Sequence, residues 1–347
     1  MNLSHLLTHT SGLVYDSSSP LLQQWSRSQG RTAHTFCGSM EGYTHPLLFE
    51  PGTSWGYGAG LDWAGVLIER ITGTRLSTYM KDNILSRLEA SCTSFLHPDQ
   101  QPQNNTSPPL LGMAYRTSSP SNRNSKAASS PLTTSNPRSK PEPSLKAGPI
   151  ILTYPLTHDL GGIGLFSTPA DFASLLASLL RDGDRLFSKG KDSTDLLLAP
   201  QLYSRYPKAG KALPAGLGRQ MKRIFGVGVD ARSSTLEQPI EQLEAGIEID
   251  HSLAGLVAMQ DIPGRRAKGS VGWAGLPNCH WWIDRKTGIA AALFTQLLPP
   301  SDEKVTGLLI SLEEALYAAV EKKEGSVNQR VDRRSQDYKG GRVGGRL

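Results

Sequence analysis

Apolar residues recur at helical spacing in three segments of the first half of the chain. The segment 61–71, LDWAGVLIERI, has one apolar face and is followed by Thr72-Gly73, which is typical of a helix end. A second helix is predicted from about Leu76 to Leu88. Residues 167–171, STPAD, open a third helix, because the threonine can cap, the proline suits the first helical position and the aspartate completes a capping box.

The last third of the chain changes to short apolar runs separated by Pro-Gly, Leu-Pro-Asn and Lys-Thr-Gly. Such runs predict an antiparallel meander, and they are GLVAMQDI at 255–262, GSVGWAG at 269–275, CHWWID at 279–284 and GIAAALFTQLL at 288–298. A closing helix is predicted after Pro299-Pro300, with an apolar face made of Leu308, Leu309, Leu312, Leu316 and Val320. The pattern predicts an α/β (α+β) domain, in which an antiparallel sheet is flanked by helices and accompanied by an all-helical region.

Two segments lack this patterning. Residues 101–148 are rich in Ser, Pro and Asn, and residues 325–347 are rich in Arg, Gly and Ser, so both are predicted to be disordered. We therefore expect one domain over 1–324, with 101–148 as an insertion and 325–347 as a basic tail. The net charge of +6 is concentrated in these segments, since 116–146 carries +5 and the tail +4, which leaves −3 for the remainder. The predicted folded part is mildly acidic, which argues against a nucleic-acid partner.

Cysteine usage and the N-terminal sequence indicate the compartment. Cys37, Cys92 and Cys279 are odd in number and far apart, without the close pairs of a zinc or redox motif, so reduced thiols are expected. The start MNLSHLLTHTSG has no basic region followed by an apolar run, and no window reaches the roughly 18 apolar residues of a membrane span. We expect a cytoplasmic protein without a membrane partner.

The stretch from Pro51 to Gly65, PGTSWGYGAGLDWAG, fits two different serine-hydrolase signatures. In one, Gly52 to Gly56 form a G-x-S-x-G elbow with Ser54 as nucleophile. That alternative needs a base and an acid, for which the sequence offers His251 or His280 with Asp171 or Asp230. Pro51 lies where the strand of an elbow should end, and the predicted helix starts only at Leu61. In the other signature Tyr57 is the catalytic group.

The order of several motifs favours Tyr57. The motifs are HLLTHTSGL at 5–13, F-x-P-G-x-x-W-x-Y at 49–57 followed by DWAG and E-x-x-T-G, GGIGLFSTPADFASLL at 161–176 and GWAGLPNCHWWIDRKTGIAAALFTQLLPP at 272–300. Together they resemble serine hydrolases with the class C β-lactamase and penicillin-binding-protein fold. The DWAG helix, the W-x-G-x-P-N turn and the Q-x-x-P-P end are most similar to fungal esterases and acyltransferases of the lovastatin transesterase type, which function in secondary metabolism.

The resemblance implies an acyl-enzyme mechanism without metal or cofactor. In this family a serine of an S-x-x-K motif attacks an ester, thioester or lactam carbonyl, and lysine and a tyrosine held near a cation take the proton. Tyr57 matches the tyrosine, as general base, and Trp273-Ala274-Gly275 matches the third motif. The amide of Gly275 or Leu276 would then face the oxyanion. The expected substrates are small esters, thioesters or acyl groups, with an acyl-carrying protein as a possible donor. Ordinary aromatic packing is the alternative role for Tyr57 and Trp273.

The nucleophile is the part of the pattern that does not match. In the family S-x-x-K precedes the HLLTHTSGL segment, which starts here four residues after Met1. The strings Ser188 to Lys191 and Ser301 to Lys304 follow the tyrosine motif, in sequence typical of loops, and are interpreted as chance matches. We therefore expect a domain that is truncated at its N-terminus and inactive as written. The alternative is a non-catalytic protein or a fragment of a wrongly predicted gene.

Three further patterns could be taken for catalytic or metal-binding sites, but structural roles are favoured for them. Lys286-Thr287-Gly288 spells a lactamase third motif, yet its position between two strands predicts a hairpin turn with Gly288 at positive φ. His5 and His9 have the spacing of two metal ligands on a helix but no neighbouring third ligand, which favours capping and loop hydrogen bonds. Asp62 is expected to cap the helix after Tyr57.

Overall fold

A five-stranded antiparallel sheet forms the centre of the molecule. The computed structural model describes residues 1–97, 108–117, 144–211 and 248–340, the side chains as far as residue 322. The strand order is β3-β4-β5-β6-β7, so the sheet is a meander in chain order. The predicted meander is confirmed as β4 to β7, and β3, which was not predicted, pairs with β4 at one edge of the sheet. The bounds are β3 Ile249–His251, β4 Leu256–Ala258, β5 Val271–Ala274, β6 His280–Asp284 and β7 Ile289–Leu293.

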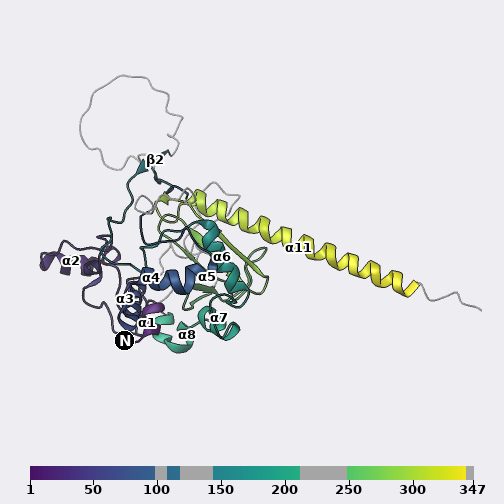
Figure 1. Cartoon of the computed structure of the whole chain (residues 1–347), viewed down its shortest axis with the longest axis horizontal. Coiled ribbons are helices and arrows are strands. Elements are labelled where there is room, and N and C mark those ends of the chain that lie inside the picture. The colour runs from purple at the N-terminus through teal and green to yellow at the C-terminus, as the bar shows by residue number, and fades with distance from the viewer. Residues whose placement is uncertain (98–107, 118–143, 212–247, 341–347) are drawn as a thin grey trace, which may run out of the picture.

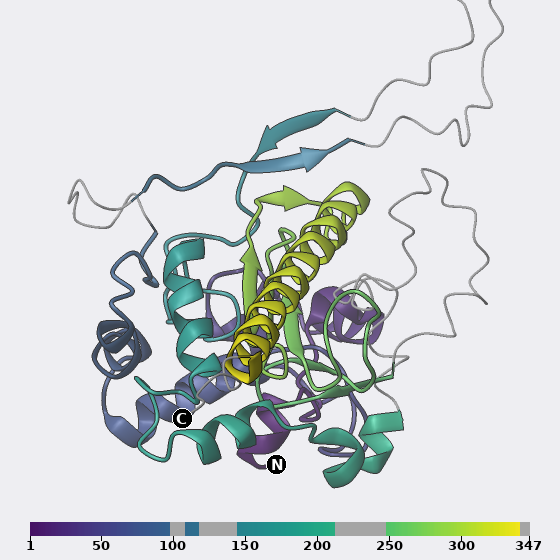
Figure 2. The ribbon, with the colours of Figure 1, turned by 90° about the vertical axis from the view of Figure 1, so that its right-hand side faces the viewer.

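Two helices cover opposite faces of this sheet. Helix α6 (Pro169–Leu180) contacts β6 and β7, and its Phe172 packs on Trp281. Thr168 caps α6 by accepting a hydrogen bond from the Asp171 amide, as the sequence predicted. Helix α11 (Glu303–Gly340) starts against the other face and then projects well beyond the domain (Figures 1 and 2). Side chains alternate along a strand, so Trp281 points toward α6 and its neighbour Trp282 toward α11.

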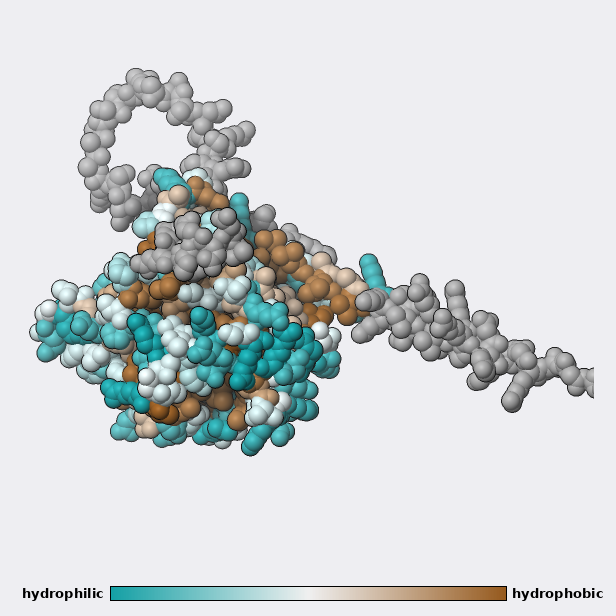
Figure 3. All heavy atoms as spheres, viewed as in Figure 1, coloured by the Kyte–Doolittle hydropathy of each residue, from teal (hydrophilic) through white to brown (hydrophobic). Residues whose placement is uncertain are grey.

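The buried face of α11 differs from the predicted one. Leu309 is fully buried, but Leu308 and Leu312 are about half exposed, at 49% and 47%. Figure 3 shows hydrophobic residues gathered on the first turns of α11, where these two leucines lie. Polar contacts fix which face of α11 is buried: Glu313 is buried against Arg265 and Arg266, and the hydroxyl of Tyr317 donates to Asp284. The leucine pattern predicted a different face, because it gave no weight to buried charged residues.

The helical region packs beside the β3–β5 side of the sheet and contains the N-terminal segment. The first helix, α1, contacts α3, which begins just after the tyrosine motif. Helix α3 ends at Thr72-Gly73, as predicted, and Gly73 adopts the left-handed conformation. The helix predicted over 76–88 is present as three consecutive helical segments, of which the first and last are α-helical and the middle one is a π-helix. The bounds are α1 Leu3–Leu7, η1 Asp16–Ser18, α2 Pro20–Ser28, η2 Met40–Tyr43, α3 Gly60–Thr72, α4 Leu76–Met80, η3 Lys81–Leu85, α5 Ser86–Leu88, α7 Lys191–Leu198 and α8 Leu202–Arg205.

A small second sheet lies where the insertion was predicted. Strand β1 (Met113–Arg116) pairs antiparallel with β2 (Leu145–Gly148) and parallel with β8 (Leu297–Leu298). Within the predicted 101–148 insertion, 113–116 and 145–148 are therefore strands that join the domain, which corrects the prediction of disorder there, while 101–107 and 118–143 lie outside the described residues. Likewise, α11 continues as a helix through 325–340, where a disordered tail was predicted. The reason is that adding residues to a helix that is already formed avoids the unfavourable step of helix nucleation.

Candidate active site

Tyr57 lies at the junction of the helical region and the sheet. Its ring is 4.8 Å from that of His9, 5.3 Å from Tyr15 and 5.4 Å from Trp273 on β5, measured between centroids. The segment around it is fixed by backbone hydrogen bonds to the N-terminal motif, from Tyr15 N–H to Tyr57 O and from Gly56 N–H to His9 O. The structure therefore brings together the HTSG, W-x-Y and W-x-G motifs, which are far apart in sequence.

The indole of Trp273 lies beside the Tyr57 ring, 5.4 Å away between centroids, and acts on the pKa of the phenol as a hydrogen-bond donor. Burial, and then the charge of Asp62, raise the pKa of Tyr57 to about 12, while the indole bond opposes this rise by favouring the phenolate. In the described part of the chain the group bonded to the phenol is thus a neutral donor, where a cation was expected from the resemblance.

Asp62 is a buried support of the tyrosine cluster. It is the third residue of α3, fully buried, and its carboxylate accepts from Gly162 N–H at 2.9 Å and Tyr15 O–H at 3.1 Å. Burial raises its pKa to about 6. The prediction that Asp62 caps α3 is wrong, because Ala59 occupies the cap position and Asp62 instead ties α3 to residues 15 and 162.

Two neutral histidines complete the wall of the site. His9 has a left-handed backbone (φ 56°) and accepts a bond from the Gly58 amide on Nδ1. Its ring lies 5.6 Å from that of His251, whose Nδ1 bonds the Ser252 carbonyl. Burial lowers the pKa of His9 to about 3 and that of His251 to about 4, so both rings are uncharged at neutral pH. His5 serves in the capping box of α1, and the described residues hold no group of three or more metal-ligating side chains.

The third motif ends in a tight turn between β5 and β6. The amide of Gly275 donates to the carbonyl of Cys279 at 2.7 Å, so this N–H is used within the hairpin. The amide of Leu276 makes no backbone hydrogen bond among the described residues, and its side chain is 40% exposed. Of the two predicted oxyanion donors, Leu276 is therefore the one with a free N–H.

Asn278 fixes this turn to the following segment. It has a left-handed backbone (φ 58°) and is buried. Its amide nitrogen donates to the carbonyls of Leu297 and Pro299, at 2.7 and 2.9 Å, and its oxygen accepts from the Asp302 amide. The sequence analysis noted this residue only as part of the W-x-G-x-P-N turn; an asparagine at a turn position was the available signal.

Ser54 has no catalytic surroundings in the described structure. No strand leads into it, and α3 begins at Gly60 rather than directly after the serine. The proposed acid Asp171 instead accepts bonds from the Cys92 amide and the Thr93 hydroxyl. Asp230, the other proposed acid, lies outside the described residues. The elbow geometry is absent around Ser54.

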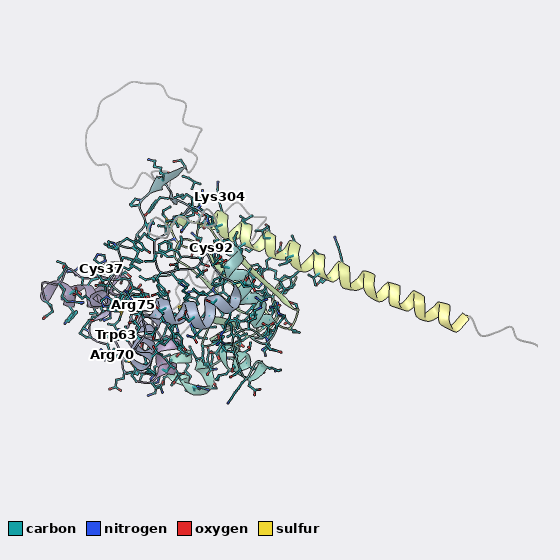
Figure 4. The ribbon with its side chains drawn as sticks, in the orientation of Figure 1. Cys37, Trp63, Arg70, Arg75, Cys92 and Lys304 are labelled. Atoms are coloured by element: carbon teal, nitrogen blue, oxygen red, sulfur yellow. The ribbon has the colours of Figure 1, made fainter. Side chains whose placement is uncertain are left out.

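The two S-x-x-K strings do not place serine and lysine on one helical turn. Ser188 precedes α7, whose first residue Lys191 forms an ion pair with Asp195. Ser301 has a left-handed backbone (φ 60°) ahead of α11, at the start of which Lys304 lies (Figure 4). Neither string has the expected S-x-x-K geometry.

The Lys286-Thr287-Gly288 string forms the predicted turn between β6 and β7. Gly288 has φ 71°, and Asp284 accepts bonds from the amides of Lys286 and Thr287 on one carboxylate oxygen. Elsewhere, Cys37, Cys92 and Cys279 are not joined in disulfides in the described structure; the first two are labelled in Figure 4. Among the helices described, none is both long and apolar enough to cross a membrane.

Comparison with known proteins decides the family. Residues 1–314 match the sequence profile of the Beta-lactamase family. The chain belongs to this family. The predicted resemblance and the predicted fold class, an antiparallel sheet flanked by helices with a helical region, are confirmed.

Among curated members of the β-lactamase family, the chain is similar to fungal acyltransferases. It is 32% identical over 323 residues to monacolin J acid methylbutanoyltransferase of Aspergillus terreus, covering 92% of this chain and 67% of that protein. It is 31% identical to acyltransferase calJ of Penicillium decumbens, covering 90% and 65%. Lovastatin esterase of Penicillium rubens is 27% identical, with 87% and 65% covered. The chain thus spans about two thirds of the length of these relatives.

The chain is also similar in structure to solved acyltransferases and hydrolases. The chain superposes on a mutant of simvastatin synthase from Aspergillus terreus with a TM-score of 0.68 and 27% identity, over 93% of this chain and 66% of that one. The unliganded simvastatin synthase gives a TM-score of 0.65 at 27% identity, over 92% and 68%. EstCE1, a hydrolase with promiscuous acyltransferase activity, shares the fold at a TM-score of 0.54 and 17% identity, over 87% and 69%.

Proposed function

We propose that this chain carries the base and oxyanion part of a serine acyltransferase or esterase site, with Tyr57 as general base. The carrying observation is the position of the Tyr57 phenol beside Trp273 of β5, which lies three residues before Leu276 in the chain. Homologues that act as acyltransferases and esterases support this assignment.

In the proposed reaction a serine oxygen forms a bond to the carbonyl carbon of an ester or thioester. In its phenolate form Tyr57 takes the serine proton and passes it to the leaving alcohol or thiol as the bond to that group breaks. The Leu276 amide donates to the developing oxyanion. In the second half, water or an acceptor hydroxyl loses its proton to Tyr57 and attacks the acyl carbonyl carbon. The bond from that carbon to the serine oxygen then breaks, and Tyr57 returns the proton to the serine.

The serine of this reaction is proposed to come from an S-x-x-K segment ahead of His5, the motif order of the family. The acyl donor is proposed to be a small thioester or an acyl-carrying protein, and the acceptor a small-molecule alcohol, as the names of the relatives suggest. We place the reaction in the cytoplasm, without nucleic acid or membrane.

Translating the genomic sequence upstream of Met1 tests the origin of the nucleophile. An in-frame or spliced S-x-x-K supports the enzyme, and an intergenic sequence without it favours the non-catalytic alternative. In the protein encoded with that segment, a fluorophosphonate probe should label its serine. Labelling of Ser54 that is lost in Ser54→Ala would overturn the proposal in favour of an elbow mechanism.

Tyr57→Phe tests the base. In the protein encoded with the S-x-x-K segment, we expect hydrolysis of p-nitrophenyl butyrate to fall by about 10² to 10⁴ in kcat, because proton transfer in the transition state is lost. Tyr203→Phe is the matched control, since Tyr203 is 47% exposed on α8. Unchanged hydrolysis in Tyr57→Phe would reduce Tyr57 to a packing residue.

A further inference from the structure

Asp62 is a fully buried carboxylate that forms no ion pair within the described part of the chain. It accepts hydrogen bonds from two neutral groups instead, the Tyr15 hydroxyl at 3.1 Å and the Gly162 amide at 2.9 Å. Burying a carboxylate without a cation costs stability. Buried ionisable groups of this kind gather at functional sites, so the position of Asp62 calls for a functional explanation.

Gly162 makes the close packing around this carboxylate possible. It belongs to the motif GGIGLFSTPADFASLL at 161–176, which has no role in the reaction steps proposed above. A Cβ on Gly162 would lie 2.6 Å from Oδ2 of Asp62 and 2.9 Å from the hydroxyl oxygen of Tyr15. A larger residue would therefore push the carboxylate and the hydroxyl out of place. Glycine at this position lets the loop approach α3 closely enough for its amide to reach Asp62.

Tyr15 connects Asp62 to the proposed base. Its ring is 5% exposed and stands edge-on to the ring of Tyr57, with centroids 5.3 Å apart and an interplanar angle of 83°. The backbone amide of Tyr15 also donates to the carbonyl of Tyr57 at 3.3 Å. Tyr15 is thus held against Tyr57 through its backbone and its ring, and the hydrogen bond to Asp62 fixes the far end of that ring.

We propose that Asp62 is a positioning residue, which through Tyr15 holds the Tyr57 phenol in the orientation that accepts the serine proton. Gly162 fixes the carboxylate for this role. The inference rests on the proposed function of Tyr57 and deepens it. Asp62 touches neither the substrate nor the reacting atoms, and it exchanges no proton. A small displacement of a catalytic group lowers the rate strongly, so an ordered base can offset the stability lost by burying the charge.

The charge of Asp62 gives this role a second readout. After burial, that charge is the largest influence that raises the pKa of Tyr57. Tyr43 also lies beside Tyr15, with ring centroids 5.7 Å apart, but its hydroxyl donates to the carbonyl of Thr35. Replacing Asp62 by asparagine should therefore lower the pKa of Tyr57 while loosening its position.

The test compares Asp62→Asn, Tyr15→Phe and the double variant in the protein encoded with the S-x-x-K segment. For p-nitrophenyl butyrate at pH 8, we expect each single variant to lower kcat about tenfold and to change KM less than about twofold, because positioning acts in the transition state. The two residues act through one contact, so the double variant should be at most about twofold slower than the slower single variant. Independent roles would multiply to about a hundredfold.

Thermal unfolding of the same samples separates positioning from a loss of folded protein. Asp62→Asn removes a buried charge and is expected to gain stability at pH 8, so unfolding would not account for a lower kcat. The matched control is Asp16→Asn. Asp16 is another buried carboxylate, 7% exposed and next to Tyr15 in the chain, but it accepts from the amide of Thr35. Its replacement should leave kcat unchanged.

Gly162→Ala keeps the test decisive if Tyr15→Phe fails to fold. We expect it to lower kcat about as much as Asp62→Asn, because the added methyl group displaces the carboxylate. Gly307→Ala is its control, since a Cβ there meets nothing within 4 Å, and kcat should stay at the parent value.

A titration of the chain without the S-x-x-K segment separates this inference from the proposed function. The phenolate of Tyr57, measured as the difference between each variant and the same variant with Tyr57→Phe, should form at lower pH in Asp62→Asn than in the parent. An unchanged kcat in Asp62→Asn, an unshifted titration, or effects that multiply in the double variant would overturn the inference. Tyr57-dependent hydrolysis that is indifferent to Asp62 and Tyr15 removes only the positioning role. A shifted titration without Tyr57-dependent hydrolysis removes the catalytic proposal and leaves a structural contact.

Discussion

The rings of Trp273 and Tyr57 lie 5.4 Å apart between centroids, so this pair joins the β-sheet to the helical region at the centre of the site, and the indole favours the phenolate of Tyr57 as a hydrogen-bond donor. An indole can donate but not accept at this nitrogen, and it carries no charge at any pH. The bond therefore stabilises the phenolate by a fixed amount, while burial and the charge of Asp62 act against it.

Replacing Trp273 by Phe should raise the pKa of Tyr57 above its value of about 12, because the donor that favours phenolate is lost. The measurement is an ultraviolet titration of phenolate, with Tyr57 isolated as the difference between the parent chain and Tyr57→Phe. We expect the phenolate of Tyr57 to form at higher pH in Trp273→Phe than in the parent chain. Trp25→Phe on α2 is the control, and an unshifted titration in Trp273→Phe would show that the bond is weak.

Gly58→Ala should severely destabilise the chain. A Cβ on Gly58 would lie 1.8 Å from the carbonyl oxygen of Leu13 and 2.5 Å from the Cα of Val14, and both atoms belong to backbone that cannot move independently. We expect a loss of about 3 kcal/mol or more in the free energy of unfolding, measured by urea denaturation. Gly307→Ala in α11, where a Cβ meets nothing within 4 Å, should be neutral or stabilising. Similar effects of the two substitutions would contradict this packing.

Acid should destabilise the chain through its buried histidines. Burial lowers the pKa of His9 to about 3 and those of His251 and His280 to about 4, below the ordinary 6.5. Their stabilising contribution is present above pH 6.5 and is lost as the pH falls toward 4, on the order of 3 kcal/mol for each group.

The variant His280→Phe should lower the slope of the unfolding free energy against pH by an amount that corresponds to about one proton. The reason is that the His280 ring is 4% exposed and neither nitrogen has a hydrogen-bond partner among the described residues. Urea denaturation at pH values from 4 to 8 measures it. The exposed-site variant His158→Gln is the control. Parallel curves for the parent and His280→Phe would rule out a contribution from His280.

The contribution of Asp62 to stability should depend on pH with the opposite sign to that of the buried histidines, and Asp62→Asn tests this. Its pKa is raised to about 6, so the folded state holds a proton between about pH 4 and 6 that the unfolded chain releases. The parent therefore loses stability as the pH rises through 6, and Asp62→Asn should be more stable than the parent at pH 8, by about 2–3 kcal/mol, with a smaller difference at pH 5. Thermal unfolding followed by circular dichroism at both pH values checks this, with Asp192→Asn, at an exposed position of α7, as control. A difference that does not change with pH would contradict the raised pKa.

The parts of the fold that the sequence predicted correctly are those governed by local rules. The cap at Thr168, the end of α3 at Thr72-Gly73 and the turn at Gly288 each depend on a few neighbouring residues. The meander followed from apolar runs separated by turn residues. For the candidate site, the order of motifs in the sequence assigns Tyr57 and Trp273 to one site, and in the structure their ring centroids lie 5.4 Å apart.

The parts that were missed depend on long-range partners. The rotation of α11 follows from Glu313 meeting Arg266, which the sequence does not juxtapose. Asp62 was assigned to a cap because its partners, Tyr15 and Gly162, are remote in the chain. The strands at the ends of the 101–148 segment contain few strongly apolar residues, so only their pairing with each other and with β8 reveals them.

Asn278 couples the turn of the third motif to one wall of the cleft that is lined by Phe36, Ile151, Leu276, Leu298, Pro299 and Pro300, because its side chain bonds Leu297, Pro299 and Asp302. An effort to widen this cleft would therefore meet two different walls. For the proposed reaction, we expect changes at 298–300 to be transmitted to the Leu276 amide and to lower the rate, and changes at Phe36 or Ile151 to alter size selectivity alone. The wall of Phe36 and Ile151 is therefore the one to engineer if the proposed oxyanion donor is to stay in place.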